Sequence, residues 1–184
     1  MSDVHGKGFA EYEPAARPAQ RPTPPVQVRA LAATDVTDCA TLIASRGGGD
    51  PGLSADKLRR DLAHPDRHLF VAVSGDDVVG YGAVIRHEPT PADPPDTAPA
   101  GYYLVGLMIA SHWRRRGIGA LLTTTRMTFV RRHADEVWCF ANIANTAVLD
   151  LQRHLGFAEV TRQFSFPGAP LTPGTTVLLR ASLH

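Results

Sequence analysis

The sequence is poor in cysteine and has no long apolar run, and both absences exclude classes of protein. Two cysteines, Cys39 and Cys139, are too few for the disulfide framework of a small secreted domain, and neither belongs to a CxxC or Cys/His metal pattern. No stretch approaches the roughly 20 apolar residues of a membrane span, and the N-terminus lacks the apolar core of a signal peptide. We therefore expect a protein of the reducing cytoplasm that has no membrane partner.

The sequence also lacks an excess of charge of either sign. It has 19 Lys and Arg against 18 Asp and Glu, a formal net charge of +1, so no global field favours nucleic acid. Its 8 histidines raise the question of a metal site. His64 and His68 have helical spacing, but Pro65 between them prevents one helix from presenting both rings. We expect neither a nucleic-acid partner nor a metal.

Proline content divides the chain into a tail and one domain. Residues 1–25 hold 5 prolines among Ala, Gln and charged residues, a composition that cannot bury enough apolar surface to order itself. We expect a disordered tail over 1–25, although an ordered arm packed on a partner subunit, and hence a homodimer, stays open. Residues 26–184 are long enough for one domain with a sizeable core.

Hydrophobic periodicity predicts the element order β-α-α-β-β-β-α-β-α-β-β. Runs of apolar and β-branched residues predict strands at 26–31, 68–73, 78–85, 102–109, 137–141, 157–166 and 175–183. Cap and stop signals predict helices from Thr34 or Asp35 to the glycines at 47–49, from Ser54 to before Pro65, over 117–132, and from Asn145 to Gly156.

The segment 88–100 interrupts this pattern with 5 prolines. Such a composition predicts a semi-rigid extended excursion between two strands. It either shapes a pocket or is a neutral surface insertion, and the sequence leaves both interpretations open.

One segment has the composition of an anion-binding turn. The strand at 102–109 is followed by a short polar turn, the arginines 114–116, and Gly117 and Gly119 at the start of a helix. N–H groups in the first helical turn have no intrahelical partner, and the macrodipole is positive there, so an anion is favoured. Glycine lets a diphosphate approach, and arginine adds charge-assisted hydrogen bonds to phosphate oxygens. The segment predicts a phosphate site, with a merely solvated arginine run as the alternative.

Other glycine motifs fit this segment less well. A Rossmann fingerprint needs a third glycine where Leu122 stands, and a P-loop needs Gly-Lys-Ser/Thr, which is absent. Nucleotide hydrolysis is therefore not expected.

Two spaced motifs together give a resemblance to a known family. Arg114, Gly117 and Gly119 match the signature Arg/Gln-x-x-Gly-x-Gly/Ala, and Asn145 opens a helix that ends in Gly-Phe at 156–157. With the order of elements around them, residues 26–183 resemble the GNAT family of acetyl-CoA-dependent N-acetyltransferases. The resemblance implies an α/β (α+β) fold with a mixed, mostly antiparallel sheet of about seven strands and flanking helices.

The resemblance also implies how acetyl-CoA, the expected co-substrate, is held. In the family the pantetheine arm lies between two parallel strands that splay apart, here 102–109 and 137–141. The N–H near Met108 would polarise the thioester carbonyl as an oxyanion donor. The positions carried over for cofactor binding are Leu107, Met108, Ile109, Arg114, Arg115, Arg116, Gly117, Ile118, Gly119, Ala120 and Asn145.

The sequence departs from the family at the acid and base positions. The helix position that is commonly Tyr is Gln152, which cannot protonate a leaving thiolate, and the strand position that carries a Glu base in some relatives is Phe140. Strand alternation without a bulge places Tyr103 on the face of Leu107, and Glu88 ends the third strand. Tyr103 and Glu88 are therefore the candidate bases. Proximity and desolvation alone are the alternative.

The acceptor is expected to be a small amine. In the family, acceptors enter near the early helices and the last hairpin loop, here 46–54 and 167–174, which carry few charges. A polycationic acceptor would need an acidic rim, so we favour a small or amino-acid-like amine over a protein terminus. A catalytically silent acyl-CoA-binding module is the alternative from another class, because the usual Tyr and Glu are absent. An Arg-rich nucleic-acid binder is disfavoured by the near-zero net charge.

Overall fold

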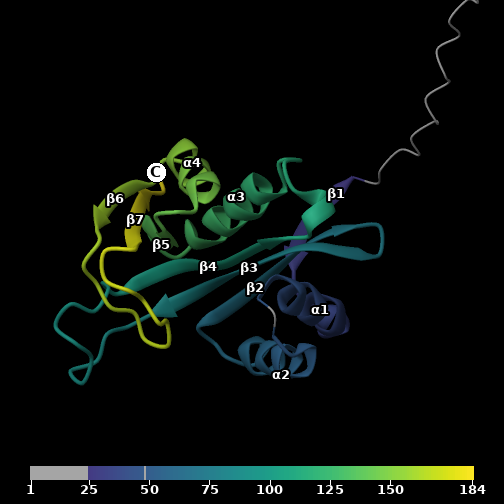
Figure 1. Ribbon diagram of the computed structural model, residues 1–184, viewed down its shortest axis with the longest axis horizontal. Helices are drawn as coiled ribbons and strands as arrows, with labels where there is room; N and C mark the ends of the chain where they lie inside the picture. The colour runs from purple at the N-terminus through teal and green to yellow at the C-terminus, as the bar shows by residue number, and fades with distance from the viewer. Residues whose placement is uncertain (1–24, 48) are drawn as a thin grey trace, which may run out of the picture.

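The computed structural model describes residues 25–47 and 49–184, which form one sheet with helices on both faces (Figure 1). The strands are β1 Val26–Ala30, β2 Arg67–Ser74, β3 Asp77–His87, β4 Gly101–Ile109, β5 Glu136–Asn142, β6 Ala158–Thr161 and β7 Thr176–Ser182. The helices are α1 Val36–Gly47, α2 Pro51–Leu62, α3 Ile118–Val130 and α4 Thr146–His154, with short 3-10 turns η1 Ala33–Asp35 and η2 Ser111–Trp113. The tail expected over 1–25 lies outside the described residues, except for Pro25.

The sheet has the strand order β1-β2-β3-β4-β5-β7-β6. Every neighbouring pair is antiparallel except β4 and β5, which are parallel because α3 carries the chain back between them. Helices α1 and α2 cover one face of the sheet, and α3 and α4 cover the other (Figure 1). The α/β fold class and the element order expected from the sequence are confirmed.

Each face of the sheet has its own apolar core. Leu122 of α3 is fully buried in one core, and Leu58 of α2 is buried in the other. Cys39 and Cys139 are free and buried, and burial raises the pKa of each thiol to about 12, so both remain protonated at neutral pH. No helix among the described residues is long and apolar enough to cross a membrane.

A third, aromatic cluster lies on the α1 and α2 face of β4, β5 and β7, and two loops close over it. Its buried members are Ala98, Tyr103, Trp138, Phe166 and Leu178. The loops 88–100 and 162–175 join by a bridge between Thr97 and Ser165, with the Ala98 N–H donating to the Ser165 carbonyl at 2.9 Å. The proline-rich segment is thus part of the packing of this face, because it supplies Ala98 to the cluster and a partner for the second loop.

Strand β4 is interrupted by a β-bulge. The register between β3 and β4 shifts so that Gly106 and Leu107 together oppose Gly82. Gly106 has a φ of 69°, which glycine adopts without steric strain. The extra residue reverses the alternation of side chains along the rest of the strand, so Leu107 and Ile109 pack toward α3.

The second helix begins earlier than the sequence pattern suggested. Asp50 is its N-cap, since its carboxylate accepts hydrogen bonds from the N–H groups of Gly52 at 2.5 Å and Leu53 at 3.3 Å. Pro51 follows as the first helical residue, where its missing N–H costs nothing. The expected start at Ser54 is therefore wrong by about one turn.

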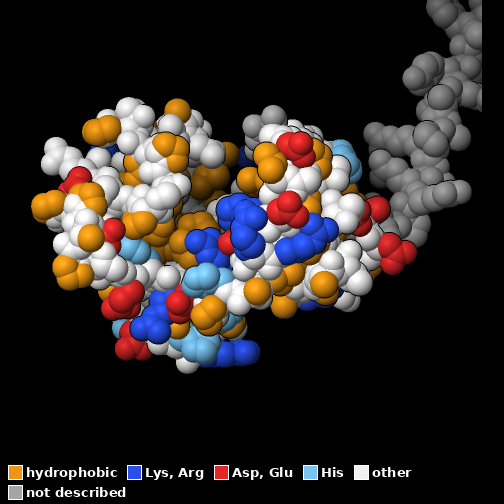
Figure 2. All heavy atoms as spheres, turned by 90° about the horizontal axis from the view of Figure 1, so that it is seen from below, with side chains coloured by type: hydrophobic (Ala, Val, Ile, Leu, Met, Phe, Trp, Pro, Cys, Tyr) orange, Lys and Arg blue, Asp and Glu red, His pale blue; other side chains and the backbone are white. Residues whose placement is uncertain are grey.

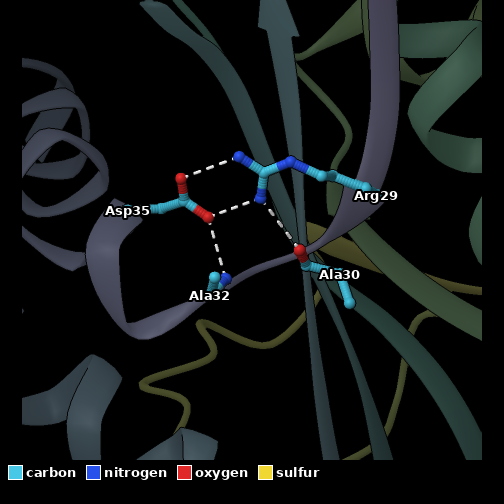
Figure 3. Close-up of polar contacts among 4 residues, drawn as sticks. All are labelled: Arg29, Ala30, Ala32 and Asp35. Carbon is cyan, nitrogen blue, oxygen red and sulfur yellow. Dashed lines mark hydrogen bonds and ion pairs between the residues drawn. The ribbon is translucent and has the colours of Figure 1, made fainter. Parts of the chain in front are cut away.

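An ion pair fixes the entry of the chain from β1 into α1 (Figure 3). The Arg29 guanidinium donates two hydrogen bonds to the Asp35 carboxylate, at 2.6 and 2.9 Å, and the same carboxylate accepts the Ala32 N–H at 2.8 Å. Asp35 thus reaches back to the turn that precedes it instead of capping the helix ahead. The hydrogen bond and charge of Arg29 lower the pKa of Asp35 below its usual value.

This network gives a stability prediction. We expect Asp35→Asn to lower the free energy of unfolding by about 1–2 kcal/mol at pH 7, because a charge-assisted bidentate pair is lost. Since the pKa of Asp35 is lowered on folding, the difference from wild type is constant from about pH 5 to 8 and shrinks as the pH falls below about 4. Urea unfolding at pH 7 and pH 3 measures it.

The matched control is Asp56→Asn, which removes the exposed ion pair with Arg59. We expect almost no change in stability for this variant. Equal stabilities of wild type and Asp35→Asn at pH 7, or a difference that is the same at pH 3, would contradict the structural role given to Asp35.

Candidate functional site

The predicted anion-binding turn lies at the N-terminus of α3. Gly117 is the N-cap, in the left-handed conformation with a φ of 79°, and Arg115 also has a positive φ, of 62°. The first hydrogen bond of the helix runs from the Leu121 N–H to the Gly117 carbonyl at 3.0 Å. The N–H groups of residues 118–120 therefore have no partner within the described helix and point out of its positive end.

Strands β4 and β5 separate beside this turn. They pair only at Tyr103 with Trp138 and at Leu104 with Cys139, although β4 continues to Ile109 and β5 continues to Asn142. Backbone donors and acceptors along the inner edge of β4 beyond Leu104 are consequently not used by β5. An extended ligand with amide groups fits between the two strands as an additional strand would.

The wedge and the turn open into one cavity of about 500 Å³. It is lined by Leu107, Ile109, Trp113, Arg114, Arg115, Gly117, Ile118, Gly119, Ala120, Asn145, Ala147, Val148 and Leu151. Of the positions carried over for cofactor binding, all but Met108 and Arg116 line this cavity. Trp113 and the three apolar residues of α4 were not foreseen, although the spacing of Ala147 and Leu151 on one helical face was a signal for them.

Arg116 lies beside the cavity and contacts its wall. Its guanidinium carbon is 5.0 Å from the centroid of the Trp113 ring, a cation–π arrangement. Arg114 and Arg115 are exposed and line the cavity itself. The three arginines therefore divide into two that line the cavity and one that packs on the indole.

Helix α4 contributes a cap and a buried amide to the other side of the wedge. Asn145 is the N-cap of α4, and its side-chain oxygen accepts the Val148 N–H at 3.3 Å while the residue lines the cavity. Gln152 is only 4% exposed, and its Oε1 atom has no hydrogen-bond partner among the described residues. Gln152 lies outside the cavity lining.

The Met108 N–H, which the resemblance implied as an oxyanion donor, faces β3 and not the wedge. The Ala110 N–H donates to the Val79 carbonyl on β3 at 2.9 Å, and N–H directions alternate along a strand, so the Met108 N–H also points toward β3, where its partner is Tyr81. The same alternation directs the N–H groups of Leu107 and Ile109 toward the wedge. The expectation for Met108 assumed a regular strand, and the bulge shifts by one residue which N–H groups face the wedge.

The two candidate bases lie away from the cavity. Tyr103 is fully buried in the aromatic cluster, its hydroxyl donates to the Pro99 carbonyl at 2.6 Å, and burial raises its pKa. The expectation that Tyr103 shares a face with Leu107 is wrong, because the bulge lies between them. Glu88 is exposed at the far end of β3, 3.5 Å from Arg86.

Phe140, at the position of the family's Glu, is part of an aromatic wall. Its ring centroid is 5.0 Å from that of Phe166 and 6.0 Å from that of Phe164. Strand alternation directs Phe140 toward the α1 and α2 face. Figure 2 shows this face, with apolar side chains in the hollow between the two helices and the loops of the aromatic cluster.

The arrangement can hold an anion and donate hydrogen bonds, but it offers little proton chemistry. None of the described residues that line the cavity is Asp, Glu, His or Tyr. The site thus has two cavity-lining arginines, free helix N–H groups and an unpaired strand edge. These features define a protein that binds an elongated anionic ligand between two splayed strands.

Comparisons with known proteins agree with this class. The model of the Acetyltransferase (GNAT) family matches residues 37–157. N-alpha-acetyltransferase RimI of Mycobacterium tuberculosis is 32% identical over 138 residues, which cover 75% of this chain and 82% of the relative. The crystal structure of the ribosomal-protein-S18-alanine N-acetyltransferase from Escherichia coli matches with a TM-score of 0.63 at 17% identity, covering 86% of this chain and 94% of that one. An aminoglycoside 6'-acetyltransferase type Ii matches with a TM-score of 0.65 at 17% identity, covering 86% and 97%.

The chain belongs to the GNAT acetyltransferase family and is an N-acetyltransferase. The residues present fit a CoA group, because the glycine turn leaves the helix N–H groups open, two arginines face the cavity and β4 keeps an unpaired edge. The pyrophosphate of CoA would lie against residues 114–120, and the pantetheine arm would run along β4 from Leu107 to Ile109. Bound acetyl-CoA would supply the reactive thioester, and these residues would orient it.

The division among the arginines is testable. We expect Arg114→Met to weaken acetyl-CoA binding about tenfold at low salt, because a charge-assisted hydrogen bond in the cavity is lost. Arg116→Met is the matched variant and is expected to weaken binding less, since Arg116 lies outside the cavity lining and contacts Trp113. Isothermal titration at low and high salt measures both, and the gap between wild type and Arg114→Met should narrow at high salt. Equal losses for the two variants would contradict the division.

Proposed function

We propose that this protein transfers the acetyl group of acetyl-CoA to the N-terminal α-amine of a polypeptide. The observation that carries the proposal is the packing of Phe140 into the aromatic wall, which leaves no carboxylate at the usual base position. The relationship to a relative named as an N-alpha-acetyltransferase supports the same acceptor class. The proposal departs from the small amine expected from charge alone.

The argument rests on the protonation state of the acceptor. An amine attacks only as the free base, and an α-amine has a pKa of about 8, whereas a lysine or polyamine nitrogen has a pKa of about 10.4. Near pH 7.5 roughly a quarter of α-amines but only about one in a thousand lysine amines are unprotonated. A site whose cofactor cavity is lined by no Asp, Glu, His or Tyr among the described residues is therefore suited to an α-amine and poorly suited to a more basic nitrogen.

The protein's part in the reaction is to position two reactants and stabilise charge. The amine nitrogen attacks the thioester carbonyl carbon, the C–S bond breaks, the CoA thiolate leaves, and the new ammonium loses its proton to water. The Leu107 N–H donates to the carbonyl oxygen as negative charge develops there. Gln152 donates no proton to the thiolate, which leaves unaided because a thiol pKa of about 8.5 makes the thiolate a weak base, and the thiolate takes its proton from water afterwards.

A small-molecule amine is the second candidate acceptor. It is supported by the few charges of the segments 46–54 and 167–174, which offer no continuous acidic surface for a cationic polymer. The silent acyl-CoA-binding module that the sequence left open is not retained, because the chain is an N-acetyltransferase. The two buried free cysteines fit a reducing cytoplasmic setting for either acceptor.

The acceptor class is tested with a matched pair of peptides. We expect acetylation of a peptide with a free N-terminus and an acetylated internal lysine. The same peptide with a blocked N-terminus and a free lysine should react at least about a hundredfold more slowly at pH 7.5, in line with the free-base fractions. CoA release measured with a thiol reagent gives both rates.

The pH dependence separates an acceptor titration from an enzyme base. The kcat/KM value should rise with pH and level off near the pKa of the peptide's own α-amine, and a peptide with a lower α-amine pKa should shift the profile downward. A profile that is the same for both peptides would indicate an enzyme base and contradict the proposal. Preference for free amino acids or polyamines would favour the small-molecule acceptor.

A further inference from the structure

A buried cation lies under the bulge of β4. Arg126 of α3 is 1% exposed, and its guanidinium donates to the carbonyls of Ala83 at 3.2 Å, Val105 at 3.1 Å and Leu122 at 3.2 Å. A longer contact of 3.4 Å joins it to the Thr123 hydroxyl. All its partners are carbonyl or hydroxyl oxygens, so it ties the helix to both strands that flank the bulge.

Arg126 has no carboxylate partner among the described residues. The titratable groups that interact with it electrostatically are Tyr81 and Cys139, whose burial keeps them neutral at pH 7. Burial lowers the pKa of Arg126 to about 10, which still leaves it charged at neutral pH. Burying an ion without a counterion is costly, and an apolar side chain would fill the same space. Such a cost is typical of functional sites.

The neighbouring strand is adapted to this guanidinium. A β-carbon on Gly82 would lie 2.8 Å from the Cζ and Nη1 atoms of Arg126, closer than the atoms allow. Gly82 has no positive φ that would otherwise require glycine. Gly82 and Arg126 therefore form a matched pair, in which the missing side chain makes room for the cation against the sheet.

The cation lies between α3 and strands β3 and β4, at the depth that the acetyl end of the co-substrate would reach along the wedge. Arg126 is eight residues beyond Ile118, about 12 Å along α3 from the anion-binding turn. Val105, to which it donates, is four residues before Ile109, about 13 Å along β4. An arm anchored at the turn and lying along β4 would end beside this point. The Leu107 N–H belongs to the peptide group that directly follows the one containing the Val105 carbonyl.

We propose that Arg126 is a positioning residue for acyl transfer, which fixes the β4 bulge and keeps a positive charge behind the Leu107 N–H where the thioester oxygen becomes negative. The inference rests on the proposed function. It gives the protein a fixed electrostatic aid that needs no proton transfer, in a site where Gln152 and Phe140 replace the family's acid and base. The Arg126 guanidinium, the β4 bulge and Gly82 are then needed together to hold this charge in place.

The first test is kinetic. We expect Arg126→Met to lower kcat for an α-amine peptide about tenfold or more, with the KM for acetyl-CoA changed less than about threefold, because the charge acts on the transition state and the turn is intact. Arg126→Lys, which keeps a charge with fewer hydrogen bonds, should recover part of kcat. The control is Arg132→Met, an exposed arginine just beyond the same helix, which should behave as wild type. Equal kcat values for wild type and Arg126→Met would overturn the inference.

Gly82→Ala provides a second variant, and should Arg126→Met fail to fold, an unchanged kcat for Gly82→Ala alone would overturn the inference. The added methyl group displaces the guanidinium without removing it, so kcat should fall, whereas adding Gly82→Ala to the Arg126→Met background should cost little more. Independent, additive losses from the two substitutions would overturn the pairing. Thermal melts of all variants ensure that rates are compared below the unfolding transition.

A spectroscopic readout separates this inference from the proposed function. The carbon-13 resonance of acetyl-CoA labelled at the carbonyl should move downfield on binding to wild type and move less on binding to Arg126→Met. Equal shifts overturn the inference, even for a protein that acetylates no amine. Wild type that binds acetyl-CoA, shows the shift difference and acetylates no α-amine overturns only the proposed function. Wild type that does not bind acetyl-CoA overturns both.

Discussion

The structure depends on strand β4 pairing with β3 along its length while leaving β5 after two residue pairs. When β4 bends away from β5, its regular hydrogen-bond register with β3 cannot continue unchanged. The bulge at Gly106 accommodates the bend by adding one residue to β4. The same bulge turns Leu107 and Ile109 toward α3 and their N–H groups toward the wedge. One inserted residue thus creates both the opening and its lining.

The bulge also leaves carbonyl groups with poor partners inside the protein, and an orphaned buried carbonyl costs free energy. Arg126 meets this need from α3, and Gly82 leaves space for it. On the opposite face, the loops at 88–100 and 162–175 close the aromatic cluster beside the same strands. The wedge is therefore held open from both sides by side chains that do not line the cavity.

Much of the fold, and most of the residues that line the cavity at the N-terminus of α3, could be predicted from sequence, because these depend on local signals. The glycine turn at 117–119 and the cap at Asn145 have fixed spacings that define backbone conformation directly. The bulge could not be predicted, since one glycine in a strand is compatible with a regular ladder, and its omission misplaced Tyr103 and Met108. The surroundings of Phe140 could not be predicted from local sequence either, because its aromatic partners come from a loop distant in sequence.

The positions of the two tryptophans have an optical consequence. Trp138 is 5% exposed inside the aromatic cluster, whereas Trp113 lines the cavity under the guanidinium of Arg116. A nucleotide entering the cavity changes the surroundings of one indole and leaves the other shielded. Intrinsic fluorescence therefore contains a reporter and an internal reference in the same chain, so ligand entry can be followed without an attached dye.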